Sequence, residues 1–329
     1  MAQIRPVGIA GTGSYLPERV VPNSWFESFI DTSDEWIRQR TGIEERRFAQ
    51  DHDQTSLLST RAAQRALEMA GVDPRDLDAI IVGTLTPDFQ LPSCAVLVQE
   101  NLKAKQAFAF DVASACTGFL NAMQVGEALI ASGRCRRVLA VGAEILSRCL
   151  DMQDRGSCIL FGDGAGAAVL MPHEDCKQGQ ILKSTMGADG ADFELIQIPG
   201  GGNKHRPHPG MFEAREHYIK LQGKGVFRFA VQKMAELVEE MLAGHPREDL
   251  CLIVPHQVNM RIIDSALERL QMPIEKVVVN IQKYANTSAA TVPIALDEAV
   301  RAGQIEKGKL VVLVAFGAGV TWGASLLRW

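Results

Sequence analysis

The sequence contains no run of about 18 apolar residues, so it offers no candidate for a transmembrane helix. Its first residues, MAQIRPVGIAGTG, lack the charged region and the long apolar segment of a signal peptide. This stretch instead predicts a first strand. From these two absences we expect no membrane partner and a cytoplasmic location.

Clusters of basic residues are also missing from the chain. It has 34 lysine and arginine residues against 39 aspartate and glutamate residues, which gives a formal net charge of -5. Without a lysine- or arginine-rich run, the chain lacks the usual electrostatic footprint of a nucleic-acid-binding protein. The acidic total does not exclude a local basic patch that binds an acidic partner.

Seven cysteines are present, but no two of them form a C-x-x-C pair. A zinc site is therefore not indicated, and no metal is expected. The number of cysteines is odd and no export signal precedes them, so free thiols in a reducing cytoplasm are expected. Most of the seven are expected to be small core residues.

The chain does contain a regular alternation of apolar strands with helical patterns. Apolar runs of strand length lie at 79–82, 138–141, 167–170, 252–254, 277–279 and 310–314. Amphipathic or apolar helical patterns lie at 57–70, 119–131, 227–242 and 260–270. This alternation predicts an α/β fold with parallel or mixed sheets.

Two blocks of the chain recur in the same order. Residues 68–77 and 240–250 each combine a helix end, a glycine, a proline turn and a following strand. Further along, Gly133 and Gly303 each end a helix that leads into an apolar strand. Gene duplication would give two similar halves, residues 1–175 and 176–329, while chance likeness between α/β units is the alternative.

Aligning Gly133 with Gly303 pairs Cys116 with Asn286. Small residues surround Cys116 between an apolar stretch and a helix, which is typical of a nucleophile on a tight turn. The N-terminus of that helix favours a thiolate and offers N–H groups to an oxyanion. The alternatives are a structural cysteine in a close-packed turn and, for Asn286, a simple helix cap.

His256 is the one histidine of seven that directly follows a strongly apolar strand run. Ligands of open α/β sheets bind beyond the carboxyl ends of strands, so His256 is a candidate acid, base or hydrogen-bond donor. Trp36 and Arg40 lie one helical turn apart and could stack on a flat ring, although surface packing would give the same pattern. Gly11-Thr-Gly13 lacks the third glycine of a dinucleotide fingerprint, so no nicotinamide cofactor is expected.

Nearly the whole chain resembles the β-ketoacyl-acyl carrier protein synthase III family, the condensing enzymes that initiate type II fatty-acid synthesis. The motifs that carry the resemblance are 11–17 (GTGSYLP), 31–36 (DTSDEW), 40–43 (RTGI), 113–119 (ASACTGF), 154–156 (DRG), 161–167 (FGDGAGA), 255–259 (PHQVN), 286–290 (NTSAA) and 316–323 (FGAGVTWG). The resemblance implies a thiolase fold, in which duplicated halves form a five-layered αβαβα sandwich, usually as a homodimer. It implies no cofactor beyond the acyl-CoA substrate.

The resemblance also implies a catalytic triad of Cys116, His256 and Asn286. Cys116 would take a short acyl group, commonly acetyl, from coenzyme A. Malonyl-acyl carrier protein would then lose carbon dioxide, and His256 and Asn286 would donate hydrogen bonds to the resulting enolate. The backbone N–H groups of Cys116 and Ala318 would form the oxyanion hole, although position 318 is glycine in many relatives.

Further binding residues follow from the same resemblance. The residues expected to bind coenzyme A are Trp36, Arg40, Arg155, Gly223, Phe227 and Asn259. The basic residues expected to bind the carrier protein are Lys224, Arg228 and Arg261. Leu91 takes the place of an aromatic residue that closes the acyl pocket from the partner subunit in several relatives. Loop 199–210 would be a lid over the tunnel or simply an insertion.

Three functions are compatible with these features. The first is the initiating synthase of fatty-acid synthesis. The second is a related acyltransferase or condensing enzyme of a natural-product pathway, with another primer or acceptor. The third is a scaffold without activity, which the chemically competent Cys-His-Asn set argues against.

Overall fold

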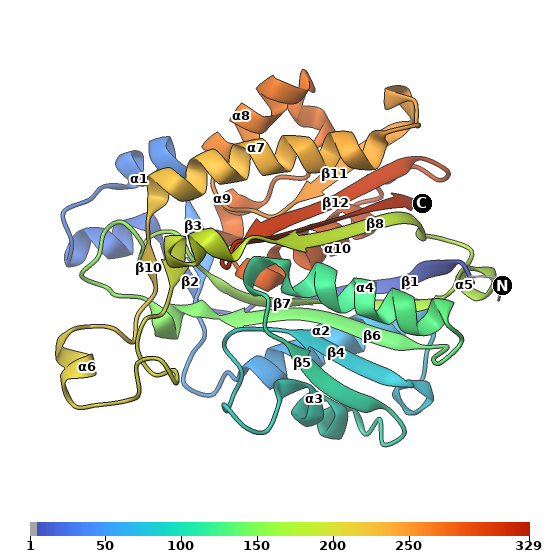
Figure 1. Ribbon diagram of the computed structural model, residues 1–329, viewed down its shortest axis with the longest axis horizontal. Helices are drawn as coiled ribbons and strands as arrows, with labels where there is room; N and C mark the ends of the chain where they lie inside the picture. The colour runs from blue at the N-terminus through green and yellow to red at the C-terminus, as the bar shows by residue number, and fades with distance from the viewer. Residues whose placement is uncertain (1–4) are drawn as a thin grey trace.

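A nine-stranded mixed sheet carries the fold of residues 5–329, which the computed structural model describes (Figure 1). Its strands lie in the order β11-β12-β13-β8-β1-β7-β6-β4-β5. Their bounds are β1 (Val7–Tyr15), β4 (Ala79–Gly83), β5 (Phe108–Val112), β6 (Val138–Ile145), β7 (Asp163–Pro172), β8 (Gln180–Ala188), β11 (Leu250–Pro255), β12 (Leu310–Gly317) and β13 (Thr321–Arg328). Two short ribbons pair β2 (Val20–Pro22) with β3 (Glu45–Arg47) and β9 (Ile196–Gln197) with β10 (Lys220–Leu221).

The sheet consists of two parts with the same pattern of strands. Strands β1 and β8 meet only where Gly8 lies opposite Gln180. On one side, β1-β7-β6-β4 runs through two antiparallel pairings and one parallel pairing. On the other side, β8-β13-β12-β11 repeats these pairings. The predicted boundary at residue 175 falls within α5 (His173–Cys176), between β7 and β8, and that boundary stays a prediction.

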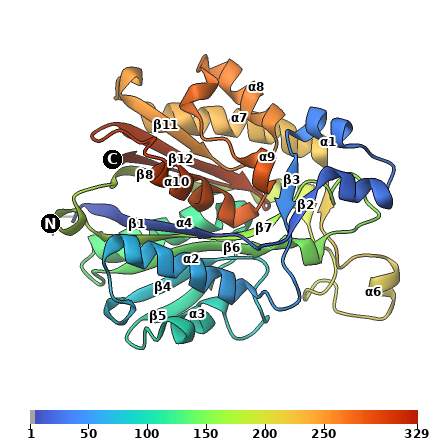
Figure 2. The same ribbon diagram turned by 180° about the vertical axis from the view of Figure 1, so that it is seen from behind.

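Helices cover both outer faces of the sheet and fill the space between its two parts (Figures 1 and 2). The helices of these three layers are α2 (Thr55–Ala70) with α3 (Cys94–Leu102), α4 (Gly118–Ala131) with α10 (Thr291–Arg301), and α7 (Gly223–Leu242) with α8 (Met260–Leu270). A separate apolar cluster joins each of the three helical layers to the sheet strands that it contacts. The predicted five-layered αβαβα sandwich is confirmed.

Burial on both faces explains why the central strands could be predicted. Every residue of β6 and of β12 is buried, because helices cover both sides of them. Helix α8 turns its apolar residues inward, and α2 ends at Gly71, whose φ of 64° suits glycine. The remaining helices are short: α1 (Asp34–Thr41), α6 (Gly210–Glu213) and α9 (Ile281–Tyr284).

Two expectations about strands need correction or completion. The strand predicted at 277–279 is wrong, since only Val277 forms a single parallel bridge, to Ile253. Strands β8 and β13 were not predicted, because their short apolar runs are interrupted by polar and small residues. The predicted first strand begins at Val7, and residues 1–4 of that stretch lie outside the described residues. Within residues 5–329, no helix is both long and apolar enough to cross a membrane.

Candidate active site

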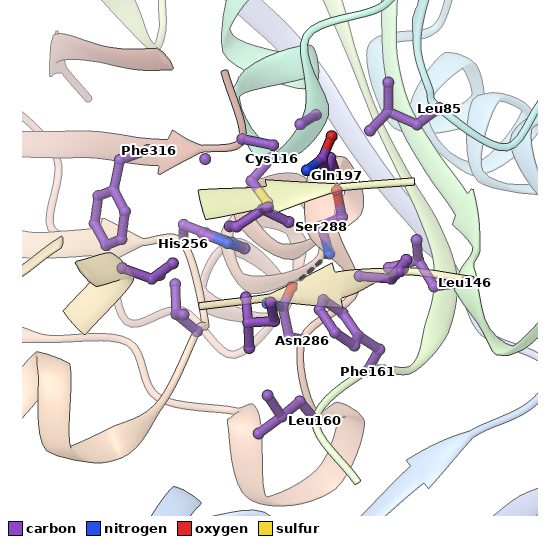
Figure 3. Close-up of a pocket in the computed structure, with 18 of the residues that line it drawn as sticks. Leu85, Cys116, Leu146, Leu160, Phe161, Gln197, His256, Asn286, Ser288 and Phe316 are labelled. Carbon is purple, nitrogen blue, oxygen red and sulfur yellow. Dashed lines mark hydrogen bonds between the residues drawn. The ribbon is translucent and has the colours of Figure 1, made fainter. Parts of the chain in front are cut away.

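A largely apolar cavity of about 160 Å³ brings Cys116, His256 and Asn286 together (Figure 3). Cys116 lies in a 3-10 turn between β5 and α4. His256 follows the last residue of β11, and Asn286 lies between α9 and α10. All three predicted triad residues therefore lie at element ends that converge on one space, as expected for the carboxyl edge of an α/β sheet.

The turn that carries Cys116 is held in an unusual conformation. Ala115 has a φ of 47°, a left-handed value that costs about 1 kcal/mol or more for a residue with a side chain. Gly317 lies against the turn, and a Cβ atom at this glycine would come within 2.8 Å of the Cys116 Cβ. The place of Cys116 thus depends on the absence of a side chain at position 317.

Burial raises the pKa of the Cys116 thiol to about 11. The neighbouring Ser288 side chain and the backbone groups of Cys116 and Ala318 oppose that rise in pKa, and the Glu144 carboxylate adds to it. The sequence led us to expect a thiolate favoured by the helix N-terminus. Backbone N–H groups do lower the pKa of Cys116, as expected, but desolvation of the sulfur raises it by more.

The structure also corrects the repeat alignment. Ala115 opens the 3-10 turn before α4, and Ser288, with a φ of 50°, opens the matching turn before α10. This match pairs Cys116 with Ala289 and not with Asn286. Helix α4 has 14 residues and α10 has 11, so aligning the glycines at their ends puts their beginnings out of step.

His256 is a buried, neutral side chain. Only 1% of its surface is exposed, and burial lowers its pKa to about 3. Its Nδ1 lies 2.6 Å from the Oγ1 of Thr291, the first residue of α10. The ring of Phe316 packs edge-to-face against it at a centroid distance of 5.8 Å. These contacts fix the plane of the imidazole and leave Nε2 for a ligand.

Asn286 is fixed through both its backbone and its amide group. Its N–H donates to the carbonyl of Leu160 at 3.0 Å, and its carbonyl accepts from the N–H of Gly162 at 3.0 Å. Its Oδ1 accepts from the N–H of Ser288 at 2.8 Å (Figure 3). Because Oδ1 is engaged in this bond, the group that Asn286 can offer to a ligand is its Nδ2 donor.

A second cavity, of about 290 Å³, adjoins the first. The apolar residues that line both cavities are Leu160, Leu221, Val226 and Val258. The predicted binding residues that line the second cavity are Trp36, Arg40, Arg155, Gly223, Phe227, Asn259 and Arg261. The guanidinium carbons of Arg40 and Arg155 lie 4.8 and 4.7 Å from the centroid of the Trp36 ring. An aromatic ring and two cations thus line the cavity that adjoins the one holding Cys116.

Three predicted residues lie outside both cavities. Lys224 and Arg228 are exposed on the first turns of α7. Leu91 is 87% exposed and lines none of the pockets described above. Because its expected role is in the pocket of a partner subunit, that role stays a prediction. Loop 199–210 does not line the cavity either, although the β9 residues that precede it do.

Sequence reasoning missed several residues of the site. The main ones are Glu144, Gln197, Ser288, Thr291 and Phe316. Glu144 ends an apolar strand run, the same signal that identified His256. Ser288 and Thr291 lie within the small-residue turn that drew attention to Asn286, but the contacts they make depend on the packing of the two halves.

Comparison with known proteins agrees with this geometry. The model of the 3-oxoacyl-[acyl-carrier-protein] synthase III family matches residues 110–190, and the model of its C-terminal part matches residues 242–329. The β-ketoacyl-[acyl-carrier-protein] synthase III of Clostridioides difficile is 47% identical over 98% of both chains. The chain belongs to the β-ketoacyl-acyl carrier protein synthase III family.

Solved structures of this family superpose on the whole chain. The synthase III of Aquifex aeolicus has a TM-score of 0.90 and 46% identity, covering 98% of this chain and 100% of its own. The priming β-ketosynthase of the R1128 polyketide pathway has a TM-score of 0.92 and 35% identity, covering 100% and 98%. The chain is therefore a condensing acyltransferase with the thiolase fold of the synthase III family.

Proposed function

We propose that Cys116 accepts a short acyl group, commonly acetyl, from acyl-CoA and transfers it to malonyl-acyl carrier protein with loss of carbon dioxide. The observation that carries the proposal is that the cavity lined by Trp36, Arg40 and Arg155 adjoins the cavity of Cys116, so that together they can form one passage for the substrate. A CoA thioester has a flat adenine ring, anionic phosphates and a long uncharged arm. The passage has cations and an aromatic ring at one end and apolar walls along its length.

In the first half-reaction, the sulfur of Cys116 attacks the thioester carbon of acyl-CoA. The backbone N–H groups of Cys116 and Ala318 lie beside this sulfur, where they already oppose the rise in its pKa. The same groups stabilise the oxyanion of the tetrahedral intermediate. Alanine at position 318 leaves its N–H available, so the difference from glycine-bearing relatives does not remove a donor.

In the second half-reaction, His256 and Asn286 donate to the thioester oxygen of malonyl-acyl carrier protein as its carboxylate leaves. A donor at Nε2 of His256 requires Nδ1 to be the acceptor. The hydroxyl of Thr291, 2.6 Å from Nδ1, is placed to supply that hydrogen if it turns from its other acceptor, the carbonyl of Ser288 at 3.0 Å. The low pKa of His256 keeps the ring neutral, so it donates without titrating. This chemistry uses no metal or further cofactor.

The carrier protein binds at the outer mouth of the passage. Lys224 and Arg228 are exposed on the first turns of α7, whose residues Gly223 and Phe227 line the second cavity. Arg261, on the neighbouring helix α8, lines the same cavity. Three cations around one opening suit an acidic partner despite the net charge of -5.

The working unit is a homodimer in the cytoplasm. Strand β5 is the last strand of the sheet, so within the described chain one of its edges has no strand neighbour. Large apolar side chains are exposed on this side, namely Leu85, Phe89, Leu91 and Phe108. A second copy that covers them would bring Leu91 to the acyl pocket. A reducing cytoplasm would keep all seven free thiols reduced.

Purified protein with acetyl-CoA and malonyl-acyl carrier protein tests the proposal. We expect carbon dioxide release in step with β-ketoacyl product, and an acetyl adduct located by mass spectrometry on Cys116. Cys116→Ala is expected to lose both the adduct and the product. Failure of the wild-type protein to release carbon dioxide with either acetyl or longer primers would refute the proposal.

A natural-product role is the second candidate, because the polyketide priming ketosynthase matches over the full chain. It uses the same fold with a different primer or acceptor. Competition among acyl-CoA primers, read by the mass on Cys116, separates the two. Preference for acetyl-CoA with the acyl carrier protein of fatty-acid synthesis favours the first candidate, and preference for another primer or acceptor favours the second.

A further inference from the structure

A buried carboxylate lies directly behind the nucleophile. Glu144, near the end of β6, has no exposed surface. Its two oxygens accept from four neutral donors: the hydroxyls of Thr84 (3.3 Å), Thr86 (2.6 Å) and Ser288 (3.2 Å), and the N–H of Leu85 (3.1 Å). Burying a carboxylate costs free energy, and here only neutral donors and no paired cation compensate for that cost. A functional reason for the buried carboxylate is therefore expected.

Ser288 connects this carboxylate to the reacting sulfur. Its Oγ donates to Oε1 of Glu144 at 3.2 Å, and Ser288 lines the same cavity as Cys116. Figure 3 shows Ser288 between Cys116 and Asn286 in the same cavity. Ser288 thus stands between the carboxylate and the cavity of the sulfur, where its hydroxyl can pass a proton from one to the other.

We propose that Glu144, acting through Ser288, holds the proton of Cys116 while the sulfur carries the acyl group. This role rests on the proposed function of Cys116 as the acyl acceptor. Glu144 does not touch the substrate, so it is a positioning residue for the proton and not a catalytic residue in the strict sense.

The proton balance of both half-reactions closes with this role. In acylation, a C–S bond forms to Cys116 and the C–S bond to coenzyme A breaks. The thiol proton passes to Ser288 while the Ser288 proton passes to Glu144, and the departing CoA thiolate takes a proton from water. In condensation, the electron pair of the carbon–carboxylate bond forms the new carbon–carbon bond, carbon dioxide leaves, and the released Cys116 thiolate recovers its proton from Glu144 through Ser288.

The surroundings of Glu144 suit a group that is charged in one state and neutral in the other. Burial raises its pKa to about 7, while its four donors oppose that rise. The titratable groups that face Glu144 are the thiols of Cys116 and Cys149. Two further charged groups, Asp163 and Arg148, lie near Cys149. A pKa near the working pH is optimal for a general base.

His256 is a weaker candidate for the same task. Burial lowers its pKa to about 3, so its imidazole holds an extra proton poorly. Its Nδ1 is already engaged with Thr291. The carboxylate is therefore the more basic of the two groups that lie close to the sulfur.

The test is the pH profile of acylation, measured as the burst of CoA released when the enzyme is mixed with acetyl-CoA alone. For the wild type, the rate should rise with pH and level off once Glu144 is ionised. Glu144→Gln still accepts from Thr86 and Leu85 but cannot take up a proton. It should acylate at least about 100-fold more slowly near neutral pH, and its rate should continue to rise with pH toward the thiol pKa.

Three further variants sharpen the comparison. Glu144→Asp keeps a carboxylate and should regain part of the rate together with the levelling. Ser288→Ala interrupts the chain and should lose the levelling as Glu144→Gln does. Asp163→Asn is the matched control, because Asp163 is an equally buried carboxyl whose partners are Ala49 and Ser147, and it should leave the profile unchanged.

Two readouts on the wild-type protein keep the test independent of how well the variants fold. Alkylation of Cys116 by iodoacetamide needs no acyl substrate and should show the same levelling with pH. An infrared difference spectrum above the pKa of Glu144 should gain a carboxylic-acid band on acylation. A profile of unchanged shape in Glu144→Gln, or acylation without that band, would overturn the relay. Alkylation that follows the relay without any CoA burst would instead refute the proposed function alone.

Discussion

Replacing Thr291 by valine removes the hydroxyl that faces His256 while keeping the shape of a buried side chain. The hydroxyl has one hydrogen and two acceptors within reach, Nδ1 of His256 at 2.6 Å and the carbonyl of Ser288 at 3.0 Å. Only donation to Nδ1 places the imidazole hydrogen on Nε2, where the enolate forms. The shorter contact is the one that the reaction needs.

The expected loss follows from leaving Nδ1 without its partner. A buried polar atom without a hydrogen bond costs about 1–3 kcal/mol, which corresponds to a decrease of about 5- to 150-fold in the condensation rate. Acylation of Cys116 should hardly change, because His256 takes no part in it. Thr291→Ser retains the hydroxyl and should retain most of the condensation rate.

Single-turnover experiments separate the two steps. Acetylated enzyme is prepared first, malonyl-acyl carrier protein labelled in its free carboxyl group is added, and the labelled carbon dioxide is counted over time. Equal losses of acylation and condensation in Thr291→Val would contradict the reasoning. Equal losses in Thr291→Ser and Thr291→Val would show that the hydroxyl is not the operative group.

Three other predictions follow from the geometry. Gly317→Ala puts a Cβ 2.8 Å from the Cβ of Cys116, so we expect the rate of acylation, measured by mass spectrometry, to fall about 10-fold or more. The circular dichroism spectrum should stay native, and an unchanged acylation rate would contradict the close packing at this glycine. Trp36→Ala should raise the KM for acetyl-CoA about 10-fold with little change in kcat, because it removes the ring on which the adenine of coenzyme A stacks. An unchanged KM would mean that the adenine binds elsewhere. The raised pKa of Glu144 means that the folded state binds more protons than the unfolded state between pH 4.5 and about 7. As the pH rises through this window, the free energy of unfolding of the wild type should therefore fall by up to about 1.4 kcal/mol per pH unit relative to that of Glu144→Gln. Urea titrations in which both proteins show the same dependence on pH would contradict this prediction.

The layers of the fold could be predicted because long buried elements leave a clear pattern in the sequence. Strands β6 and β12 are apolar over most of their lengths, since helices cover both of their faces. Strands β8 and β13 leave a weaker signal, because polar and small residues interrupt their apolar runs. The residues at 277–279 have the composition of a strand, yet only Val277 forms a bridge to a neighbour.

The candidate site could be predicted where one residue stands out against its local sequence. Cys116 lies in a turn of small residues, and His256 follows a buried strand. Asn286 was indicated by its small-residue turn, by the family resemblance and by an alignment of helix ends, and the different helix lengths put that alignment out of step. Glu144 and Ser288 lie far apart in the chain and meet only through packing of the two halves, so no local pattern could join them.

The division of labour between Cys116 and the pair His256 and Asn286 is the central claim. One measurement on His256→Ala tests it directly. The variant is mixed with acetyl-CoA and labelled malonyl-acyl carrier protein, and the adduct on Cys116 and the released carbon dioxide are counted in the same sample. The account predicts that acetyl-Cys116 accumulates while carbon dioxide release falls by about 100-fold or more. Loss of the acetyl adduct together with carbon dioxide would contradict it, because His256 would then be the base for Cys116.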